Sequence, residues 1–266
     1  MGLSDWLLPA RLPRQVVYAG DRHGEIVTLA GRRIVQRQRV DIPLADPGGA
    51  DGWAEIVARL LPVDTGIILN SEPFIFNFFE FDKLPWSRQL LRELVEWKLQ
   101  KIFPEEIAAY DHRFFRLNKK RIFSILVKKS LLADIEARFG ERSIPLIFIG
   151  NSALEIFNRL TERKPVPDFF VEVDVSSCCL VFQDRGAPVY VRKFKGGSHS
   201  GDLAAEIVKT VQFVRSNGGR DPRRFELIDH RQGVVAGELI GELAQEGLSC
   251  PDAARAMPAP YIPGCL

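Results

Sequence analysis

The stretch FDKLPWSRQLLRELVEWKLQKIFPEEIAAYDHRFFRL, residues 81–117, decides the fold. Between Leu84-Pro85 and Pro104 it predicts a helix from Trp86 to about Phe103, because apolar side chains recur there at helical spacing. These apolar residues are Leu90, Leu91, Leu94, Val95 and Ile102. The opposite face is charged, with Arg88, Arg92, Glu96 and Lys101. Beyond the proline, a segment that begins at Tyr110-Asp111 predicts a strand.

Segments on both sides of this stretch complete a small unit. FIFNFFEF (74–81) is dense in aromatic residues and predicts a strand, as does RIFSILVKK (121–129), which follows a tight turn at Asn118-Lys119. SLLADIEARFG predicts a helix that ends at Gly140. Residues 73–144 therefore predict a β-α-β-β-α unit of their own.

The rest of the chain also alternates strand-like and helix-like segments, which is typical of α/β architecture. Three short strands between residues 16 and 42 predict an antiparallel meander, and the Pro-containing break at 162–168 predicts a lobe boundary. The expected organisation is an N-terminal segment at 1–14, a first lobe at 15–72 that continues at 145–165, the inserted unit at 73–144, a second lobe at 166–250 and a Pro-rich tail at 251–266.

The second lobe carries its own pattern. Two long strands are joined at Asp184-Arg185-Gly186, and a helix at 202–214 has apolar residues at core-facing spacing. FELID (225–229) predicts a short strand, and VAGELIGELAQEG predicts a last amphipathic helix.

Composition excludes several classes of protein. The 266 residues are 46% hydrophobic, and 36 Lys+Arg against 34 Asp+Glu give a net charge of +2, which provides no basic face for nucleic acid. No segment reaches the roughly 18 apolar residues that cross a bilayer, so we expect a cytoplasmic chain. The cysteines lack zinc-site spacing and are expected to be buried thiols: Cys178, Cys179, Cys250 and Cys265.

The candidate catalytic motifs lack residues that their chemistry requires. Gly196 and Gly201 are spaced like a P-loop, but Asp202-Leu203 stand where Lys and Ser/Thr should contact phosphate and magnesium. Either Asn151 or Ser152 can cap the helix that follows. Ser152 lies in a sequence that imitates a nucleophile elbow, but Leu154 replaces the closing glycine, so a helix-cap role is expected for Ser152 instead of catalysis. The four histidines lie in different segments and are interpreted as surface or turn residues, with no metal site: His23, His112, His199 and His230.

The order of segments and two local phrases resemble the PilM family of type IV pilus assembly proteins and its relative GspL of type II secretion. In residues 81–117, Leu84-Pro85, Glu96-Trp97 and Tyr110-Asp111 hold places that are characteristic of this family. VEVDVSSCCLVFQDRGAPVYVRKFKGG resembles the strand pair of its second lobe. There the resemblance puts Asp174, Ser176 and Ser177 at a phosphate-binding turn, with Arg192 and Gly196-Gly197 at the closing hairpin.

This resemblance implies an actin-like (RNase H-like) fold of two lobes with a small inserted subdomain, and a nucleotide site in the cleft. The sequence departs from that site. The first phosphate turn reads AGDRHGEIV, which keeps only Asp21 and Gly24, and Val175 stands where a glycine is expected. Asp229-His230 replace a Gly-Gly pair after FELID, and the short link from helix 202–214 to FELID leaves no room for a fourth subdomain. The expected site is vestigial, with no cofactor.

The function implied by the resemblance is a non-catalytic scaffold at the inner face of the bacterial inner membrane, in a type IV pilus or type II secretion system. Its implied partners are a PilN-like or GspM-like membrane protein and an assembly ATPase of the GspE/PilB kind, and the resemblance also admits a homodimer. Leu84, Pro85 and Trp97 are the candidate partner contacts. The alternatives are an actin-like ATPase or switch that binds ATP with Mg through Asp21 and Asp174, and an unrelated α/β enzyme. The tail also resembles the start of a longer segment, so the sequence is compatible with a fragment.

Overall fold

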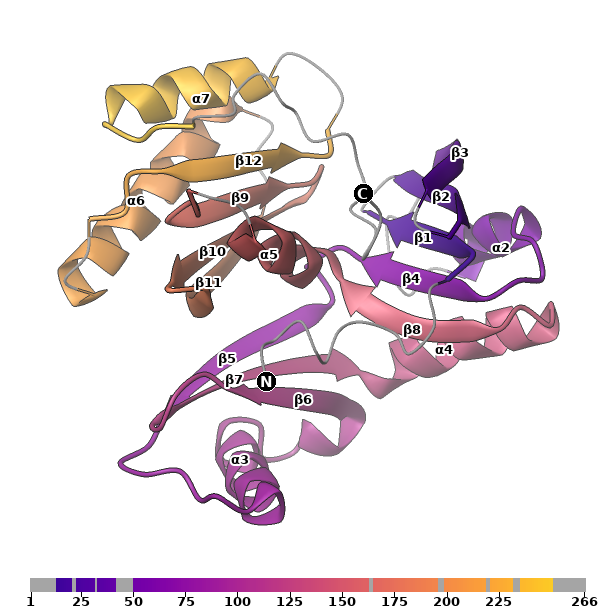
Figure 1. The fold of residues 1–266 in the computed structure, drawn as a ribbon, viewed down its shortest axis with the longest axis horizontal. Coiled ribbons are helices and arrows are strands. Elements are labelled where there is room, and N and C mark those ends of the chain that lie inside the picture. The colour runs from indigo at the N-terminus through magenta and orange to yellow at the C-terminus, as the bar shows by residue number, and fades with distance from the viewer. Residues whose placement is uncertain are drawn as a thin grey trace. The chain divides into compact units, whose positions relative to one another are not determined.

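A computed structural model describes residues 13–20, 23–31, 33–41, 50–162, 165–195, 199–218, 221–231 and 235–250 (Figure 1). The chain divides into two compact units: unit 1 comprises Met1–Glu72 and Arg138–Leu266, and unit 2 comprises Pro73–Ala137. The sequence predicts an inserted unit at 73–144, which begins where unit 2 begins and ends seven residues after it. None of the helices in the described ranges is long and apolar enough to cross a bilayer.

Unit 1 contains a five-stranded sheet in the order β3-β2-β1-β4-β8. Its strands are β1 (Gln15–Ala19), β2 (His23–Ala30), β3 (Arg33–Asp41), β4 (Thr65–Leu69) and β8 (Leu146–Asn151). The first three strands pair antiparallel, which confirms the predicted meander, whereas β1, β4 and β8 run parallel. On one face of this sheet Val16, Tyr18 and Ile68 belong to a buried apolar cluster. The helix α2 (Ala50–Ala58) buries Trp53, whose ring contacts Phe139.

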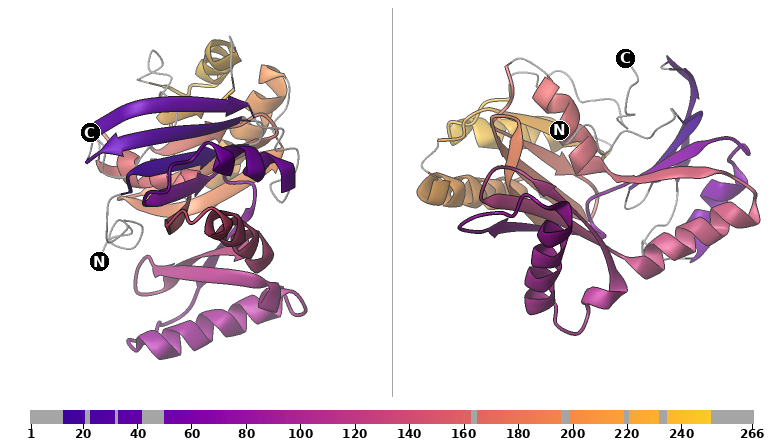
Figure 2. Two further views of the ribbon diagram at one scale, coloured as in Figure 1. Left: turned by 90° about the vertical axis from the view of Figure 1, so that its right-hand side faces the viewer. Right: turned by 60° about the horizontal axis from the view of Figure 1, so that its bottom comes forward.

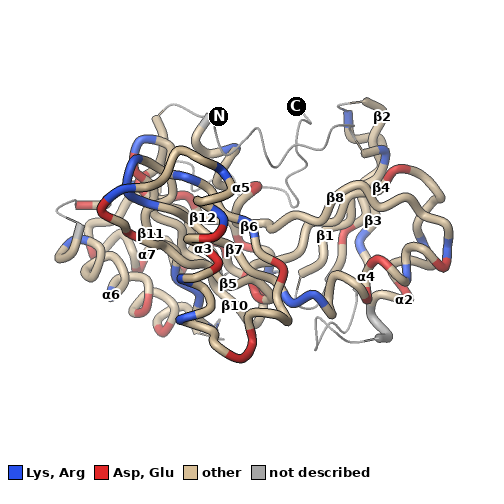
Figure 3. Tube along the Cα trace, turned by 90° about the horizontal axis from the view of Figure 1, so that it is seen from below, with Lys and Arg blue, Asp and Glu red and all other residues tan. Residues whose placement is uncertain are grey.

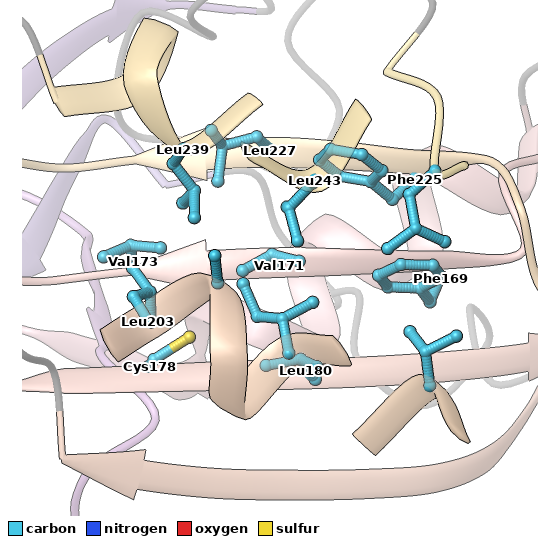
Figure 4. Close-up of a cluster of buried hydrophobic side chains, with 14 of the residues drawn as sticks. Phe169, Val171, Val173, Cys178, Leu180, Leu203, Phe225, Leu227, Leu239 and Leu243 are labelled. Atoms are coloured by element: carbon cyan, nitrogen blue, oxygen red, sulfur yellow. The ribbon is translucent and has the colours of Figure 1, made fainter. Parts of the chain in front are cut away.

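A four-stranded sheet in the order β11-β10-β9-β12 is the second sheet of unit 1. Its strands are β9 (Phe169–Val173), β10 (Ser177–Asp184), β11 (Ala187–Lys195) and β12 (Phe225–Asp229). Side chains alternate along a strand, so Phe169, Val171 and Val173 share one face. There they pack against α6 (Ser200–Gly218) and α7 (Val235–Gln245) in a core that Figure 4 shows in close-up. Figure 2 shows the ribbon of this sheet and its helices in two further views. The helix α5 (Ser152–Glu162) contacts β10.

The hairpin β10–β11 closes with a two-residue turn at Arg185 and Gly186, as the sequence predicts. Both residues have positive φ, 51° and 76° respectively. This combination is the type I′ geometry whose twist matches that of antiparallel strands, and glycine adopts the second position without a steric penalty.

Unit 2 is a three-stranded antiparallel sheet in the order β5-β7-β6. Its elements are β5 (Phe74–Glu80), α3 (Arg88–Ile102), β6 (Tyr110–Arg116), β7 (Arg121–Lys128) and the start of α4 (Lys129–Glu141), with a short 3-10 turn at Ile107–Ala109. The helix α3 lies against one face of this sheet (Figure 1). Ser87 begins the helix, because its hydroxyl accepts a hydrogen bond from the backbone N–H of Leu90 at 3.4 Å. Leu91, Val95 and Leu99 are the buried residues of α3.

Two predicted helix limits differ from the observed ones. The helix predicted at 202–214 extends over Ser200–Gly218, because polar residues at both of its ends continue the helical hydrogen bonding although they add nothing to the apolar pattern. WAEIVARLL, which follows the Gly-containing loop ADPGGADG, predicts a helix from Trp53, and the observed helix begins at Ala50. Periodicity locates the buried face of a helix better than its ends.

Substitution of Leu99 by alanine tests the packing of unit 2. Leu99 is fully buried in a cluster with Val95, Ile122 and Leu126, so its truncation leaves a cavity. We expect Leu99→Ala to lower the free energy of unfolding by about 2 to 5 kcal/mol. Leu90→Ala on the same helix is the control, because Leu90 is exposed, and it should cost less than about 1 kcal/mol. Urea unfolding followed by tryptophan fluorescence measures both, and equal losses would contradict the assignment of the buried face.

Candidate functional site

Polar side chains gather where the parallel strands of the two sheets of unit 1 end. Because β1, β4 and β8 run parallel, their carboxyl ends lie at one edge of their sheet, and the same holds for β9 and β12. Hydrogen bonds join residues from the two edges. We call this group the carboxyl-end cluster; it comprises Tyr18, Asn70, Ser71, Asn151, Glu172, Asp174 and His230. Such strand ends are where open α/β sheets bind ligands.

Glu172, on β9, links both sheets. Its side chain is 3% exposed. One carboxylate oxygen accepts a hydrogen bond from the hydroxyl of Ser71 at 2.9 Å, and the other lies 3.1 Å from Nε2 of His230. A buried carboxylate is costly unless it is paired and hydrogen-bonded, and these two partners meet that requirement.

Asp174 follows β9 and faces the first sheet. Its Oδ2 accepts hydrogen bonds from the hydroxyl of Tyr18 at 3.5 Å and from the amide of Asn70 at 3.4 Å. Its Oδ1 accepts the backbone N–H of Val175 at 2.8 Å. Asp174 is thus held by side chains from the ends of β1 and β4, as well as by its own turn.

His230 is buried, which corrects the interpretation of this histidine as a surface or turn residue. Its ring stacks on Tyr18 with centroids 4.8 Å apart, and its backbone N–H donates to the carbonyl of Val173. Burial disfavours the imidazolium, but the hydrogen bond with Glu172 and the negative charges of Glu172, Asp174 and Asp229 outweigh it and raise the pKa of His230. His112 and His199 are not buried, and the side chain of His23 lies outside the described residues.

The cationic side chains near the cluster have protein partners. Lys193 donates to the backbone carbonyls of Ser71 and Glu72 at 3.1 and 2.7 Å, and burial lowers its pKa. Arg231 forms a two-pronged pair with Asp229, at 3.0 and 2.8 Å. Asp229 therefore does not present an isolated negative charge, although it occupies one of the two predicted Gly-Gly positions.

The start of α5 contains a buried acid. Asn151, one of the two predicted caps, caps this helix, since its side-chain oxygen accepts the N–H of Leu154 at 3.1 Å; the cap role expected for Ser152 is wrong. The hydroxyl of Ser152 and one carboxyl oxygen of Glu155 are buried and have no hydrogen-bond partner among the described residues. Burial raises the pKa of Glu155 to about 8, so this side chain is mostly neutral at pH 7.

The described residues of the cluster put two acidic side chains at the junction of the two sheets. The carboxylates of Glu172 and Asp174 occupy the junction of the two sheets, and a triphosphate would add negative charge beside them. It would also displace the bonds from Tyr18, Asn70 and Ser71 that join the sheets. Within the described ranges, His, Cys, Asp and Glu form no group that could hold a metal ion.

Among the predicted vestigial-site residues that the structure describes, Asp174 alone lies in the cluster. Ser176 lies in the β9–β10 turn and Ser177 begins β10, while Gly24 lies inside β2 opposite Ala19. Asp21 and the pair Gly196-Gly197 are outside the described residues. Arg192 contacts α6, where it donates to Thr210 and Glu206, and it lies before the predicted closing turn.

Three solved structures have the same architecture. A structure described as the PilM-PilN type IV pilus biogenesis complex matches with a TM-score of 0.67 and 14% identity over 92% of each chain. The cytoplasmic domain of EpsL, an inner membrane component of the type II secretion system of Vibrio cholerae, matches with a TM-score of 0.57 and 10% identity, over 87% of this chain and 94% of that one. A Bacteroides thetaiotaomicron protein of unknown function with an actin-like ATPase fold has a TM-score of 0.56 and 11% identity, over 93% and 96%.

The chain has the actin-like fold. This confirms the predicted fold class of a two-lobed α/β protein. No family model and no curated protein matches the sequence. At the identities observed, the likeness establishes the fold alone, and function in this fold has to be argued from the site.

The motifs do not identify most residues of the carboxyl-end cluster, but a second feature of the sequence does point to them. Tyr18, Asn70, Glu172 and His230 all stand at or just after the end of a short apolar strand, as in GIILNS and FELIDH. Polar residues at that position are informative when neighbouring strands are parallel. A single sequence does not show that β4 pairs with β1 or that β12 pairs with β9, so it cannot bring these positions together.

The pair of His230 and Glu172 predicts a pH dependence of stability. Because the pKa of His230 is raised in the folded chain, its contribution is fully present below about pH 6.5 and is lost as the pH rises through the raised pKa. We expect His230→Gln to remove about 2 kcal/mol at pH 6 and progressively less at higher pH. Urea unfolding between pH 6 and 9 measures the difference, with His112→Gln as control. Parallel profiles for the wild type and His230→Gln would contradict the pairing.

Glu155 also makes the folded chain less stable as the pH rises, independently of His230. The folded chain holds its proton up to about pH 8, whereas the unfolded chain releases it near the ordinary value of 4.5, so stability falls as the pH rises between these values. This amounts to about 3 kcal/mol between pH 5 and 8. Glu155→Gln should lack that part of the decline. An unchanged decline in the variant would show that Glu155 is solvated or paired.

Proposed function

We propose that the chain is a non-catalytic scaffold in the inner-membrane platform of a type IV pilus or type II secretion system. The observation that carries the proposal is the set of direct side-chain bonds from Tyr18, Asn70 and Ser71 to Asp174 and Glu172. They join the two sheets at the strand ends where an actin-like protein would hold its nucleotide. A scaffold needs a fixed relation between these sheets and has no need of a nucleotide.

The structural relatives support the choice of machinery. One is described in a complex with PilN, and another as an inner membrane component of a secretion system. By analogy, the proposed partners are a PilN-like or GspM-like membrane protein and an assembly ATPase of the GspE/PilB kind. The proposed location is the inner face of the bacterial inner membrane.

Unit 2 is the proposed partner-binding part. Trp97 on α3 is 48% exposed, and the ammonium groups of Lys98 and Lys101 lie 5.6 and 4.0 Å from its ring. Pro85 is half-buried, and its carbonyl accepts a hydrogen bond from Arg116. Leu84 is 3% exposed and belongs to the apolar cluster of unit 2, so its side chain supports the partner surface from below. Tryptophan is one of the residues most enriched in interface hot spots.

A co-purification experiment tests the proposal. A tagged chain is recovered from detergent-solubilised membranes of its native cells, and the partners are identified by mass spectrometry. We expect a pilus or secretion platform protein with the wild type, and at least about tenfold less of it with Trp97→Ala. Phe213→Ala is the matched control, because Phe213 is an exposed aromatic residue on α6 of unit 1. Recovery of no platform protein would count against the scaffold, and equal loss in both variants would count against unit 2.

A further inference from the structure

Two segments of unit 2, residues 81–87 and 116–121, lie side by side at one end of its sheet. The backbone N–H of Phe81 donates to the carbonyl of Lys120 at 2.9 Å, and that of Leu84 donates to the carbonyl of Lys119 at 3.3 Å. Asn118 fixes the second segment, since its side-chain oxygen accepts the N–H groups of Lys120 and Arg121. The two segments therefore form one ordered surface. We call it the basic tip and define it as Lys83, Trp86, Arg116, Lys119, Lys120 and Arg121.

The basic tip concentrates positive charge in a chain whose net charge is only +2. The two segments contain five basic residues and a single acidic one, Asp82. Lys83, Lys119 and Lys120 are exposed. A second carboxylate, Glu80, lies at these strand ends, where its backbone stands opposite that of Arg121 in the register of β5 and β7. Figure 3 marks the charged positions along the trace. Runs of basic residues also occur on β3, with Arg33, Arg37 and Arg39, and on β11, with Arg192, Lys193 and Lys195.

Two exposed apolar side chains, Trp86 and Leu90, lie close to these basic residues in the sequence. Trp86 is 85% exposed, and Leu90, one turn into α3, is 54% exposed. The guanidinium of Arg116 lies 5.7 Å from the ring centre of Trp86 and also donates to the carbonyl of Pro85. Arg116 thus holds Trp86 close to the basic side chains. Because most of the tryptophan faces solvent, its ring is available to a binding partner or a bilayer.

We propose that the basic tip docks on an anionic lipid bilayer. Tryptophan favours the interface between headgroups and acyl chains, where its ring is covered and its N–H stays hydrated. Lysine and arginine around it attract anionic headgroups, and clusters of roughly four to eight such residues are typical of surfaces that bind anionic lipid. A protruding Trp86 with basic neighbours on both segments has this composition. The proposal goes beyond the scaffold function and does not depend on it.

Sedimentation with vesicles tests the proposal on the full chain. Vesicles of phosphatidylcholine and phosphatidylglycerol in equal parts are compared with vesicles of phosphatidylcholine alone. We expect binding only to the anionic vesicles, weakened when salt rises from about 0.1 M to about 0.5 M. The triple variant Lys83→Gln, Lys119→Gln, Lys120→Gln should bind on the order of 100-fold more weakly, since each basic residue contributes roughly fivefold. The triple variant Lys128→Gln, Arg142→Gln, Lys195→Gln changes the net charge equally away from the tip and should bind like the wild type.

Tryptophan fluorescence identifies the inserting residue. With anionic vesicles the wild type and Trp97→Phe should show a blue shift, and Trp86→Phe should not. Absence of vesicle binding, equal loss in both triple variants, or a shift that survives in Trp86→Phe would overturn the proposal. Binding of polyglutamate but not of vesicles through the same three lysines would also overturn it, because the tip would then be a surface for acidic protein segments.

Discussion

The burial of two carboxylates, Glu172 and Asp174, constrains the rest of unit 1. Each would cost several kcal/mol if it were left unpaired between the sheets, so donors have to reach them from neighbouring strands. Ser71, Asn70 and Tyr18 supply those donors from the first sheet, and His230 supplies one from the end of β12. The parallel order of β1 with β4 and of β9 with β12 puts these residues at matching strand ends. The strand order therefore determines which polar side chains can reach the two carboxylates at the junction.

This arrangement is what the proposed scaffold function requires of an actin-like fold. The fold needs a link between its two lobes at the strand ends, and here side chains of the chain itself provide it. Unit 2 carries exposed groups suited to contacts, with Trp97 and its lysines on α3 and the basic tip at the end of its sheet. Internal closure in unit 1 and exposed aromatic and basic groups in unit 2 together fit a protein that works by contacts with other components.

Much of the fold can be predicted from the sequence, and less of the site. The apolar periodicity that includes Leu91 and Val95 predicts α3, although two of its members, Leu90 and Ile102, are exposed. The resemblance of residues 81–117 to a known family indicates the fold class. The site depends on which distant strands lie beside each other, and one sequence does not show this. Asp174 is predictable because it belongs to a known motif, whereas a lone histidine such as His230 carries no signal of its buried partner Glu172. The cap of α5 is ambiguous in the sequence because Ser and Asn both suit that position and the two are adjacent.

The measurement that tests the central claim most directly is calorimetric titration of the full chain with ATP and magnesium. If the carboxyl-end cluster closes the junction by itself, no saturable heat should appear up to about 1 mM nucleotide, which corresponds to a binding free energy weaker than roughly 4 kcal/mol. Saturable, magnesium-dependent binding that Asp174→Asn abolishes would contradict the account. It would show that the bonds from Tyr18 and Asn70 to Asp174 open to admit a nucleotide.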